Sequence, residues 1–334
     1  MVVSSSSSSV ASSSSSSSSL LELYKDTPIK IGVIGGTGLY NLEGLELKHK
    51  DYIQTPWGRT SSQVRIFRFA STHVAFIARH GDNHEFSPSE VPVRANIAAL
   101  KLLGVEVIVA YSAVGSLREE IVPGHFVLPD QLIDRTKGIR PSTYFEGTGI
   151  VAHAGFADPF HNGLAQLIKD AADTLNGEDA NQQQLVVHAE KTVIVMEGPA
   201  FSTRAESRMY RSWGGDIINM SALPESKLAR EAEIAYQMIC MSTDYDCWRT
   251  ESGSTAEGDV TVQHVMQTMK QNAHNANRLV GKVLPLLDAA LRSNDAKYHL
   301  GDIKGSMEFS IMAGKEARQS ERAAILRTIY PNYF

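Results

Sequence analysis

The sequence predicts an α/β fold, a three-layer sandwich in which helices flank a mixed central β-sheet. Short, continuously apolar runs typical of buried strands alternate with longer segments of helical periodicity. A glycine-rich turn follows the first of these runs, as at the start of many α/β domains. With 334 residues, of which 43% are hydrophobic and 21% charged, the chain can bury a sizeable core.

The two ends of the chain are expected to lie outside this fold. Residues 4–19 consist almost entirely of serine, a composition with no apolar surface to offset the entropy of ordering. We therefore expect a disordered tail over residues 1–28, one domain over residues 29–312 and a C-terminal extension of unassigned role over residues 313–334. Deleting residues 1–25 should leave stability and turnover nearly unchanged.

Composition argues against several classes of protein. The net charge of -5 and the absence of a dense Lys/Arg stripe argue against nucleic-acid binding. Cys240 and Cys247 are the two cysteines, too few for a disulfide framework or a four-cysteine zinc site. No apolar run of about 18 residues occurs, and the first residues do not have the basic start and apolar core of a secretory signal. We expect no membrane association and a cytoplasmic protein, with a nuclear location also open.

The order of the elements follows from the same patterns. After the first strand, from Ile29, six further apolar runs are expected to be strands: residues 64–70, 73–79, 105–112, 125–130, 191–198 and 235–243. Helical periodicity appears at about residues 89–103, 162–175, 204–214, 223–233 and 260–293.

The first polar cluster is the turn Gly35, Gly36, Thr37 and Gly38. Backbone amides without side chains can approach an anion there, and Thr37 adds a hydroxyl donor. A simple tight turn after a strand is equally compatible with this pattern. A dinucleotide site is disfavoured because Asn41 stands where its glycine pattern requires a glycine.

The second cluster, Arg79 and His80, ends an apolar strand, where open α/β sheets place ligand groups. Arg79 offers a planar fork of donors for phosphate, and His80 can donate from either ring nitrogen. A surface arginine beside a loop histidine is the alternative. His80 and His84 are spaced like a zinc-binding pair but lack the glutamate and the helical context, so no metal is expected.

Three further clusters supply hydroxyls, apolar groups and carboxylates. Residues 112–116 are expected to form a compact turn of hydroxyl and amide donors after a strand. An aromatic and a thioether beside polar groups, which suit a sugar and a flat base, occur at Phe201, Ser202, Asn219, Met220 and Ser221; Met220 is equally compatible with ordinary core.

Thr243, Asp244 and Asp246 follow the strand at 235–243. Two carboxylates at one strand end can point to the same side, and repulsion with partial burial then raises the proton affinity of one of them. Such a pair suits a general acid beside a hydrogen-bond acceptor. A solvated acidic turn is the alternative.

The motifs together resemble the methylthioadenosine phosphorylases of the trimeric purine nucleoside phosphorylase family. The resemblance covers roughly residues 29–312 and rests, in order, on IGGTG, ARHG, SAVGSLREEIVPG, DQLIDRT, EGPAFSTRAES, WGGDIINMSALPE and TDYDCW. One departure is Ala200, where the family often has arginine.

The resemblance implies a phosphorylase-type sandwich, a homotrimer and a role in purine and methionine salvage. Phosphate, as co-substrate and without any other cofactor, would be held by Thr37, Arg79, His80, Ser112, Ala113 and Ser221. Methylthioadenosine would contact Phe201, Ser202, Met220, Thr243, Asp244, Asp246, Val262 and Val265, with Asp244 as the catalytic acid. A neighbouring subunit would contribute His153 and Met312.

Three other activities compete with this interpretation. A phosphorylase selective for 6-oxopurines needs a donor at the base, which two aspartates do not favour. A water-using nucleosidase and a catalytically silent nucleoside-binding protein do not need the phosphate donors that the sequence supplies.

Overall fold

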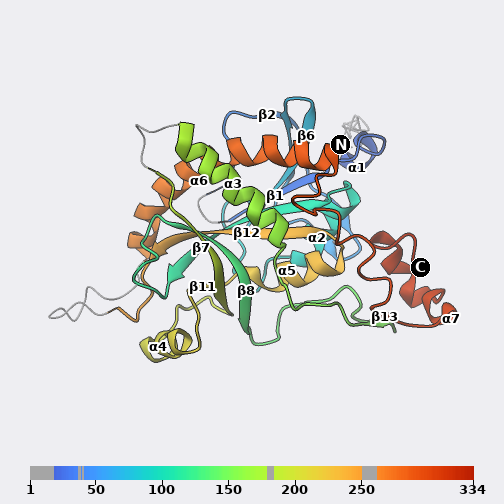
Figure 1. Cartoon of the computed structure of the whole chain (residues 1–334). Coiled ribbons are helices and arrows are strands. Elements are labelled where there is room, and N and C mark those ends of the chain that lie inside the picture. The colour runs from blue at the N-terminus through green and yellow to red at the C-terminus, as the bar shows by residue number, and fades with distance from the viewer. Residues whose placement is uncertain (1–18, 37–38, 40, 179–183, 250–261) are drawn as a thin grey trace, which may run out of the picture.

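The computed structural model describes residues 19–36, 39, 41–178, 184–249 and 262–334 (Figure 1). Within them a mixed nine-stranded sheet has the order β11-β10-β8-β12-β7-β1-β6-β5-β2. Its strands are β1 (Ile31–Gly35), β2 (Glu46–Asp51), β5 (Val64–Phe69), β6 (Thr72–Ala78), β7 (Val107–Ser116), β8 (Phe126–Arg135), β10 (Val187–Met196), β11 (Ile217–Asn219) and β12 (Ala235–Asp244). Two-residue strands form the ribbons β3 (Gln54–Thr55) with β4 (Gly58–Arg59), and β9 (Val151–Ala152) with β13 (Ile311–Met312).

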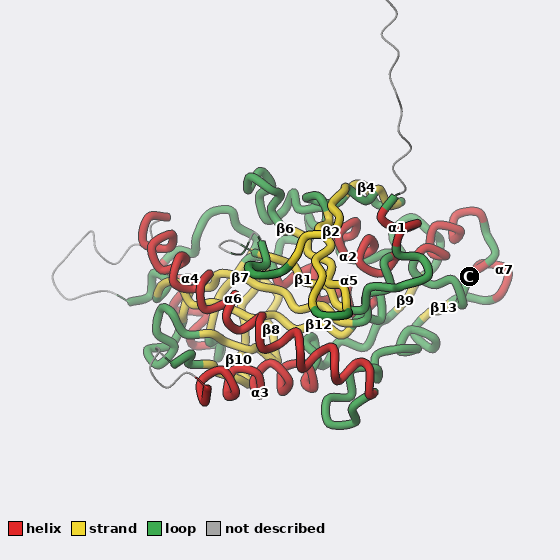
Figure 2. The backbone as a smooth tube through the Cα atoms, turned by 90° about the horizontal axis from the view of Figure 1, so that it is seen from above, coloured by secondary structure: helices red, strands yellow, loops and turns green. Residues whose placement is uncertain are grey.

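Helices cover both faces of the sheet, which confirms the predicted three layers. One face packs against α2 (Val93–Leu102) and α5 (Ala222–Glu231), the other against α3 (Asn162–Glu178) and α6 (Val262–Ser293). Figure 2 shows α3 and α6 along the same side of the sheet. Each face of the sheet has its own hydrophobic core, and successive residues of a strand point alternately into one core and the other. Ile34 packs on the α2 side and Val33 on the α6 side. Both strand faces are buried, which explains the continuously apolar runs.

Strand β11 closes part of the sheet on itself. It pairs in parallel with β10 and antiparallel with the end of β7, where Ile217 faces Ser116 and Ile218 faces Gly115. Strands β7, β12, β8, β10 and β11 thereby form a closed ring. Residues 112–116 consequently belong to β7, and the compact turn predicted for them is wrong, because pairing to β11 and β12 keeps this segment extended.

The predicted boundary of the N-terminal tail at residue 28 also needs correction. Helix α1 (Leu20–Leu23) begins at the end of the serine tract, and Leu20 and Tyr24 are buried in the same core cluster as the side chains of α2. The Tyr24 hydroxyl lies 2.8 Å from Nδ1 of His49 on β2. Residues 20–28 are therefore part of the fold, whereas residues 1–18 lie outside the described residues.

The C-terminal segment belongs to the same core. After β13 come α7 (Lys315–Arg318) and a 3-10 helix, η1 (Glu321–Thr328). Four side chains of this segment are buried in the cluster that also holds α2 and α5: Ala323, Leu326, Ile329 and Tyr330. No helix in the described part of the chain has the length and apolar character to cross a membrane.

Candidate active site

A cavity of about 750 Å³ opens where β6, β7, β11 and β12 end. It brings together predicted residues that come from widely separated parts of the chain. Those that line it are Arg79, His80, Ser112, Ala113, Phe201, Met220, Ser221, Thr243, Asp244 and Asp246. The loop after β6 adds His84, which sequence analysis considered only as a possible metal ligand. It also adds five residues that sequence analysis did not identify: Glu85, Phe86, Ser87, Pro88 and Glu90.

Arg79 is held rigidly at one end of the cavity. Its Nε and Nη2 donate to the two carboxylate oxygens of Glu225 at 2.7 and 2.8 Å, and Nη1 donates to the Tyr111 carbonyl at 2.7 Å. Both members of the ion pair are only 2% exposed. A guanidinium has five N–H groups, so two remain for a ligand, and their direction is fixed before it binds.

His80 lies beside this arginine in a neutral state. Its Nδ1 lies 2.9 Å from the Phe86 carbonyl, and because a carbonyl only accepts, Nδ1 carries the proton. Burial, followed by the charge of Arg79, lowers the pKa of His80 to about 4. Nε2 is thus an acceptor, suited to the protonated oxygen of hydrogen phosphate, and the sequence-based expectation of donation from either nitrogen is corrected. The His84 ring stacks on His80 at 4.7 Å.

Hydroxyl groups complete this end of the cavity. Ser112 lies on β7 and receives a 3.4 Å contact from the side-chain amide of Asn219. Ser221 occupies the N-cap position of α5, yet its hydroxyl makes no capping hydrogen bond. Leu223 has a non-helical φ of -115° and ψ of 138°, so the regular helix begins after it, and Ser221 lines the cavity ahead of that helix.

Met220 is positioned by a buried arginine that sequence analysis missed. Arg140 donates from Nη1 to the carbonyls of Met220 and Leu223 at 2.6 and 2.7 Å, and from Nε to Glu197 at 2.6 Å. Gly198 adopts a φ of +71°, and a Cβ there would lie 2.4 Å from the Met220 sulfur. The methionine thus lies where glycine alone leaves room. Arg140 stands in the polar stretch DRTKGIRPST, so the sequence carried no signal that this arginine is buried.

Asp244 lies at the opposite end of the cavity. Its Oδ2 accepts from the Thr243 hydroxyl at 2.6 Å and its Oδ1 from the Asp246 backbone N–H at 2.9 Å. Burial raises its pKa to about 6, with the charge of Asp246 contributing and the two hydrogen bonds opposing. A carboxyl with this pKa can hold and release a proton near neutral pH.

Asp246 is the more buried of the two carboxylates, at 6% exposure. Its Oδ2 accepts a short hydrogen bond from the hydroxyl of Ser207 on α4 (Arg204–Ser212), and burial raises its pKa. A Cβ at Gly115 would lie 3.1 Å from Asp244 Oδ1 and 3.3 Å from Asp246 Cβ. Glycine at this point of β7 leaves room for both carboxylates. They share one cavity wall, as the sequence predicted.

Some predicted residues lie elsewhere or cannot be placed. Ser202 is buried outside the cavity lining, and its hydroxyl contacts the Met196 sulfur at 3.4 Å. Thr37 falls outside the described residues. Val262 and Val265 belong to the first turns of α6, and their side chains fall outside the description.

His153 and Met312 lie away from this cavity, on the β9–β13 ribbon. Met312 pairs with Val151, and the His153 N–H donates to the Ser310 carbonyl at 2.9 Å. Met312 is 69% exposed. Figure 1 shows β13 and α7 at the opposite end of the molecule from α4. The two residues therefore do not complete their own chain's cavity.

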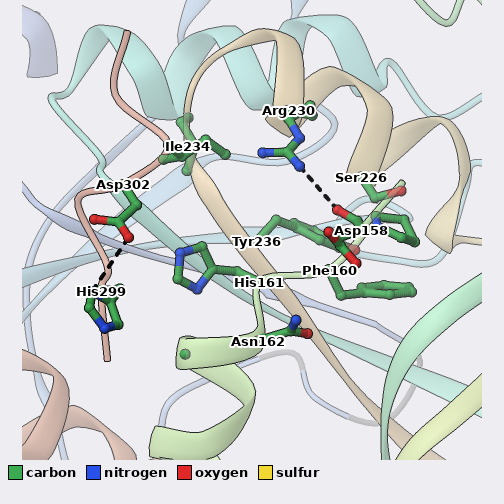
Figure 3. Close-up of a pocket in the computed structure, with 13 residues that line it drawn as sticks. Asp158, Phe160, His161, Asn162, Ser226, Arg230, Ile234, Tyr236, His299 and Asp302 are labelled. Carbon is green, nitrogen blue, oxygen red and sulfur yellow. Dashed lines mark hydrogen bonds and ion pairs between the residues drawn. The ribbon is translucent and has the colours of Figure 1, made fainter. Parts of the chain in front are cut away.

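A second cavity of about 310 Å³ lies between the start of α3 and the end of α5 (Figure 3). Arg230 donates to the Asp158 carbonyl at 3.2 Å within it. It contains none of the predicted residues, and it adjoins the first site through Tyr236, whose hydroxyl donates to Glu225 at 2.7 Å. Across the described residues, no group of three or more His, Cys, Asp or Glu side chains is arranged to hold a metal ion.

Comparisons with known proteins agree with this geometry. The model of the phosphorylase superfamily matches residues 30–285. An S-methyl-5′-thioadenosine phosphorylase of Neurospora crassa is 53% identical, with 92% of this chain and 96% of the relative covered. One of Aspergillus fumigatus is 51% identical, covering 92% and 88%.

Solved structures add to this similarity. A methylthioadenosine phosphorylase from an antarctic soil metagenomic library has a TM-score of 0.78 at 38% identity, covering 90% of this chain and 99% of its own. The Schistosoma mansoni enzyme in complex with adenine has a TM-score of 0.75 at 31% identity, covering 85% and 99%. The chain belongs to the phosphorylase superfamily, within the family of the S-methyl-5′-thioadenosine phosphorylases.

Proposed function

We propose that the chain catalyses the reversible phosphorolysis of 5′-deoxy-5′-methylthioadenosine to adenine and 5-methylthioribose 1-phosphate. The observation that carries this proposal is that the two ends of the cavity carry different chemical groups. One end presents a fixed arginine with hydroxyl groups, and the other presents two carboxylates, one of which has a pKa of about 6. A ligand with an anion at one end and a basic heterocycle at the other matches this arrangement.

At the first end, phosphate would bind to the two remaining N–H groups of Arg79 and to the hydroxyls of Ser112 and Ser221. The neutral His80 would accept the proton of hydrogen phosphate at Nε2. Such contacts place a phosphate oxygen beneath the anomeric carbon and raise its effective concentration. Positive charge that develops on the ribose is then stabilised by phosphate itself.

At the other end, Asp244 would donate a proton to N7 of adenine. The C1′–N9 bond breaks, its electron pair moves into the purine, and a phosphate oxygen forms the new bond to C1′. Protonation of N7 stabilises the departing base in the transition state. Asp246 would accept a hydrogen from the exocyclic amino group, an interaction that a 6-oxo group cannot provide.

The 5′-methylthio group would be enclosed by a second copy of the chain. His153 and Met312 are exposed on a ribbon that does not reach its own cavity, and the apolar side chains Val151 and Phe309 are also exposed, at 56% and 90%. Contiguous exposed apolar groups favour an interface. We propose a homotrimer in which this ribbon completes the neighbouring site.

The experiment that tests the proposal is an assay of adenine release from methylthioadenosine with and without phosphate, with inosine as the competing substrate. Phosphate-dependent release of adenine and a strong preference over inosine are expected. Release that needs no phosphate would indicate a nucleosidase, binding without turnover would indicate a silent binding protein, and a preference for inosine would indicate a 6-oxopurine phosphorylase. Sedimentation showing an active monomer would contradict the trimer.

A further inference from the structure

The β9–β13 ribbon has an inner and an outer face. Ile311 is buried, and Ala152 packs against the same core, whereas Val151 and Met312, which face each other across the ribbon, are exposed. Each strand of the ribbon is two residues long. So short a ladder is a weak constraint on the direction of the exposed side chains.

Met312 lies at the centre of a tight three-residue turn. The Ala313 N–H donates to the Ile311 carbonyl at 3.0 Å, which closes the turn around it. Arg318 of α7 donates from Nε to the Ala313 carbonyl at 3.0 Å and from Nη2 to the Ile311 carbonyl at 3.2 Å. One planar guanidinium therefore holds the carbonyl on each side of Met312.

The C-terminal segment in turn holds Arg318. The last residue, Phe334, places its ring 5.9 Å from the guanidinium carbon. Phe334 lies 6.1 Å from Tyr330, which stacks on Phe145 at 5.7 Å. Tyr330 is buried, and its hydroxyl donates to the Glu231 carbonyl at the end of α5. The turn at Met312 is thus connected through Arg318 to the domain core.

We propose that Arg318 is a positioning residue for the neighbouring subunit's site, because it fixes the turn that presents Met312 to the 5′-substituent of the bound nucleoside. The C-terminal extension, on this proposal, contributes to substrate specificity. The inference rests on the proposed function in one respect, the placement of Met312 in the neighbouring cavity. It extends that function to a residue that contacts no substrate.

The test is a double-mutant cycle of Arg318→Gln and Met312→Ala, read as the KM for methylthioadenosine in full-length trimer. Because Arg318→Gln removes both hydrogen bonds to the turn, we expect the KM to rise about threefold to tenfold. The kcat and the KM for phosphate should not change. If Arg318 acts through Met312, the rise should disappear in the Met312→Ala background.

Two matched variants sharpen the test. Arg318→Lys keeps the charge but loses the planar fork, so it should behave like Arg318→Gln. Arg322→Gln removes an exposed arginine of the same segment and should leave every constant unchanged. If Arg318→Gln dissociates the trimer, Arg318→Lys is read in the same cycle.

The outcomes are distinguishable. An unchanged KM in the Arg318 variants, or an equal rise in KM in the wild-type and Met312→Ala backgrounds, would overturn the inference about Arg318. If Met312→Ala alone raises the KM in that case, the proposed placement of Met312 in the neighbouring site still holds. If Met312→Ala itself has no effect on KM in an intact trimer, the placement of Met312 in the neighbouring site fails, and Arg318 fails with it. Phosphate-dependent adenine release is judged separately.

Discussion

Replacing Asp244 with asparagine should lower activity and raise stability at the same time. The side chain is half-buried in the cavity wall, and its pKa rises from 3.8 to about 6 on folding. The folded state therefore binds the proton more tightly, so that stability decreases as pH rises from about 4 to 6 and stays at its lower value above pH 6. A pKa difference of about 2 corresponds to at most about 3 kcal/mol.

Asparagine removes this cost because it cannot ionise. Its oxygen can still accept from the Asp246 N–H, and its amide can donate to Thr243, whose hydroxyl also lies 3.2 Å from the Val114 carbonyl. At pH 8 the free energy of unfolding of Asp244→Asn should exceed that of the wild type by about 1–3 kcal/mol. Below pH 4 the two proteins should be equally stable.

Turnover should change in the opposite direction. Loss of general acid catalysis typically lowers the rate about 10²- to 10⁴-fold. The pKa of Asp244 predicts that kcat/KM of the wild type decreases as pH rises through about 6, and the variant should lose this decrease. The assays are urea unfolding at pH 4 and pH 8 and phosphate-dependent adenine release from pH 5 to 9. Undiminished turnover would refute Asp244 as the acid. Equal stability of the two proteins at pH 8 would refute the conclusion that folding raises the pKa of Asp244.

Three further outcomes are expected. Deleting residues 1–18 should leave the melting temperature unchanged. Deleting residues 1–25 should instead cost about 2–5 kcal/mol, contrary to the expectation from the sequence, because the buried side chains of Leu20 and Tyr24 are lost; thermal unfolding of both truncations checks this. Asp246→Asn should narrow the preference for methylthioadenosine over inosine, since an amide can donate to a 6-oxo group; the ratio of the two kcat/KM values measures it, and an unchanged ratio would exclude the proposed base contact. Glu225→Gln should destabilise the protein by about 3–5 kcal/mol because the buried charge of Arg79 is left unpaired. Saturating phosphate should restore part of that loss in urea unfolding, and no phosphate-dependent recovery would argue against phosphate at Arg79.

Sequence patterns predicted the layers of the fold because its strands are buried on both faces, and such strands produce unmistakable apolar runs. The sequence patterns did not predict strands that are exposed or very short. Strand β2 is almost entirely exposed and reads as polar, and β11 is three residues long. The pairing of β11 with β7, which converts the expected turn at residues 112–116 into strand, is a long-range contact with no local signature.

Several ligand-facing residues were predictable because they follow the end of an apolar strand, as Arg79, Met220 and Asp246 do. The buried groups behind them were not. Glu225 and Arg140 lie far along the chain from the residues they hold, Arg79 and Met220. Their pairing depends on tertiary structure, and a charged residue in a sequence is usually a surface residue. Tyr24 was missed for a different reason, because the serine tract before it obscured the start of the fold.

Strand β7 contacts residues at both ends of the site. The carbonyl of Tyr111 holds Arg79, Ser112 lines the phosphate end, the carbonyl of Val114 holds Thr243, and Gly115 leaves room for the carboxylates. A strand advances about 3.3 Å per residue, so the distance between the anion and the base is set by a count of residues along one rigid backbone. A displacement of β7 along its axis would move both ends together and leave their separation unchanged. Strand β7 therefore fixes the separation between the anion and the base that the sugar must span. Changes in substrate tolerance should arise from the loops and from the neighbouring chain.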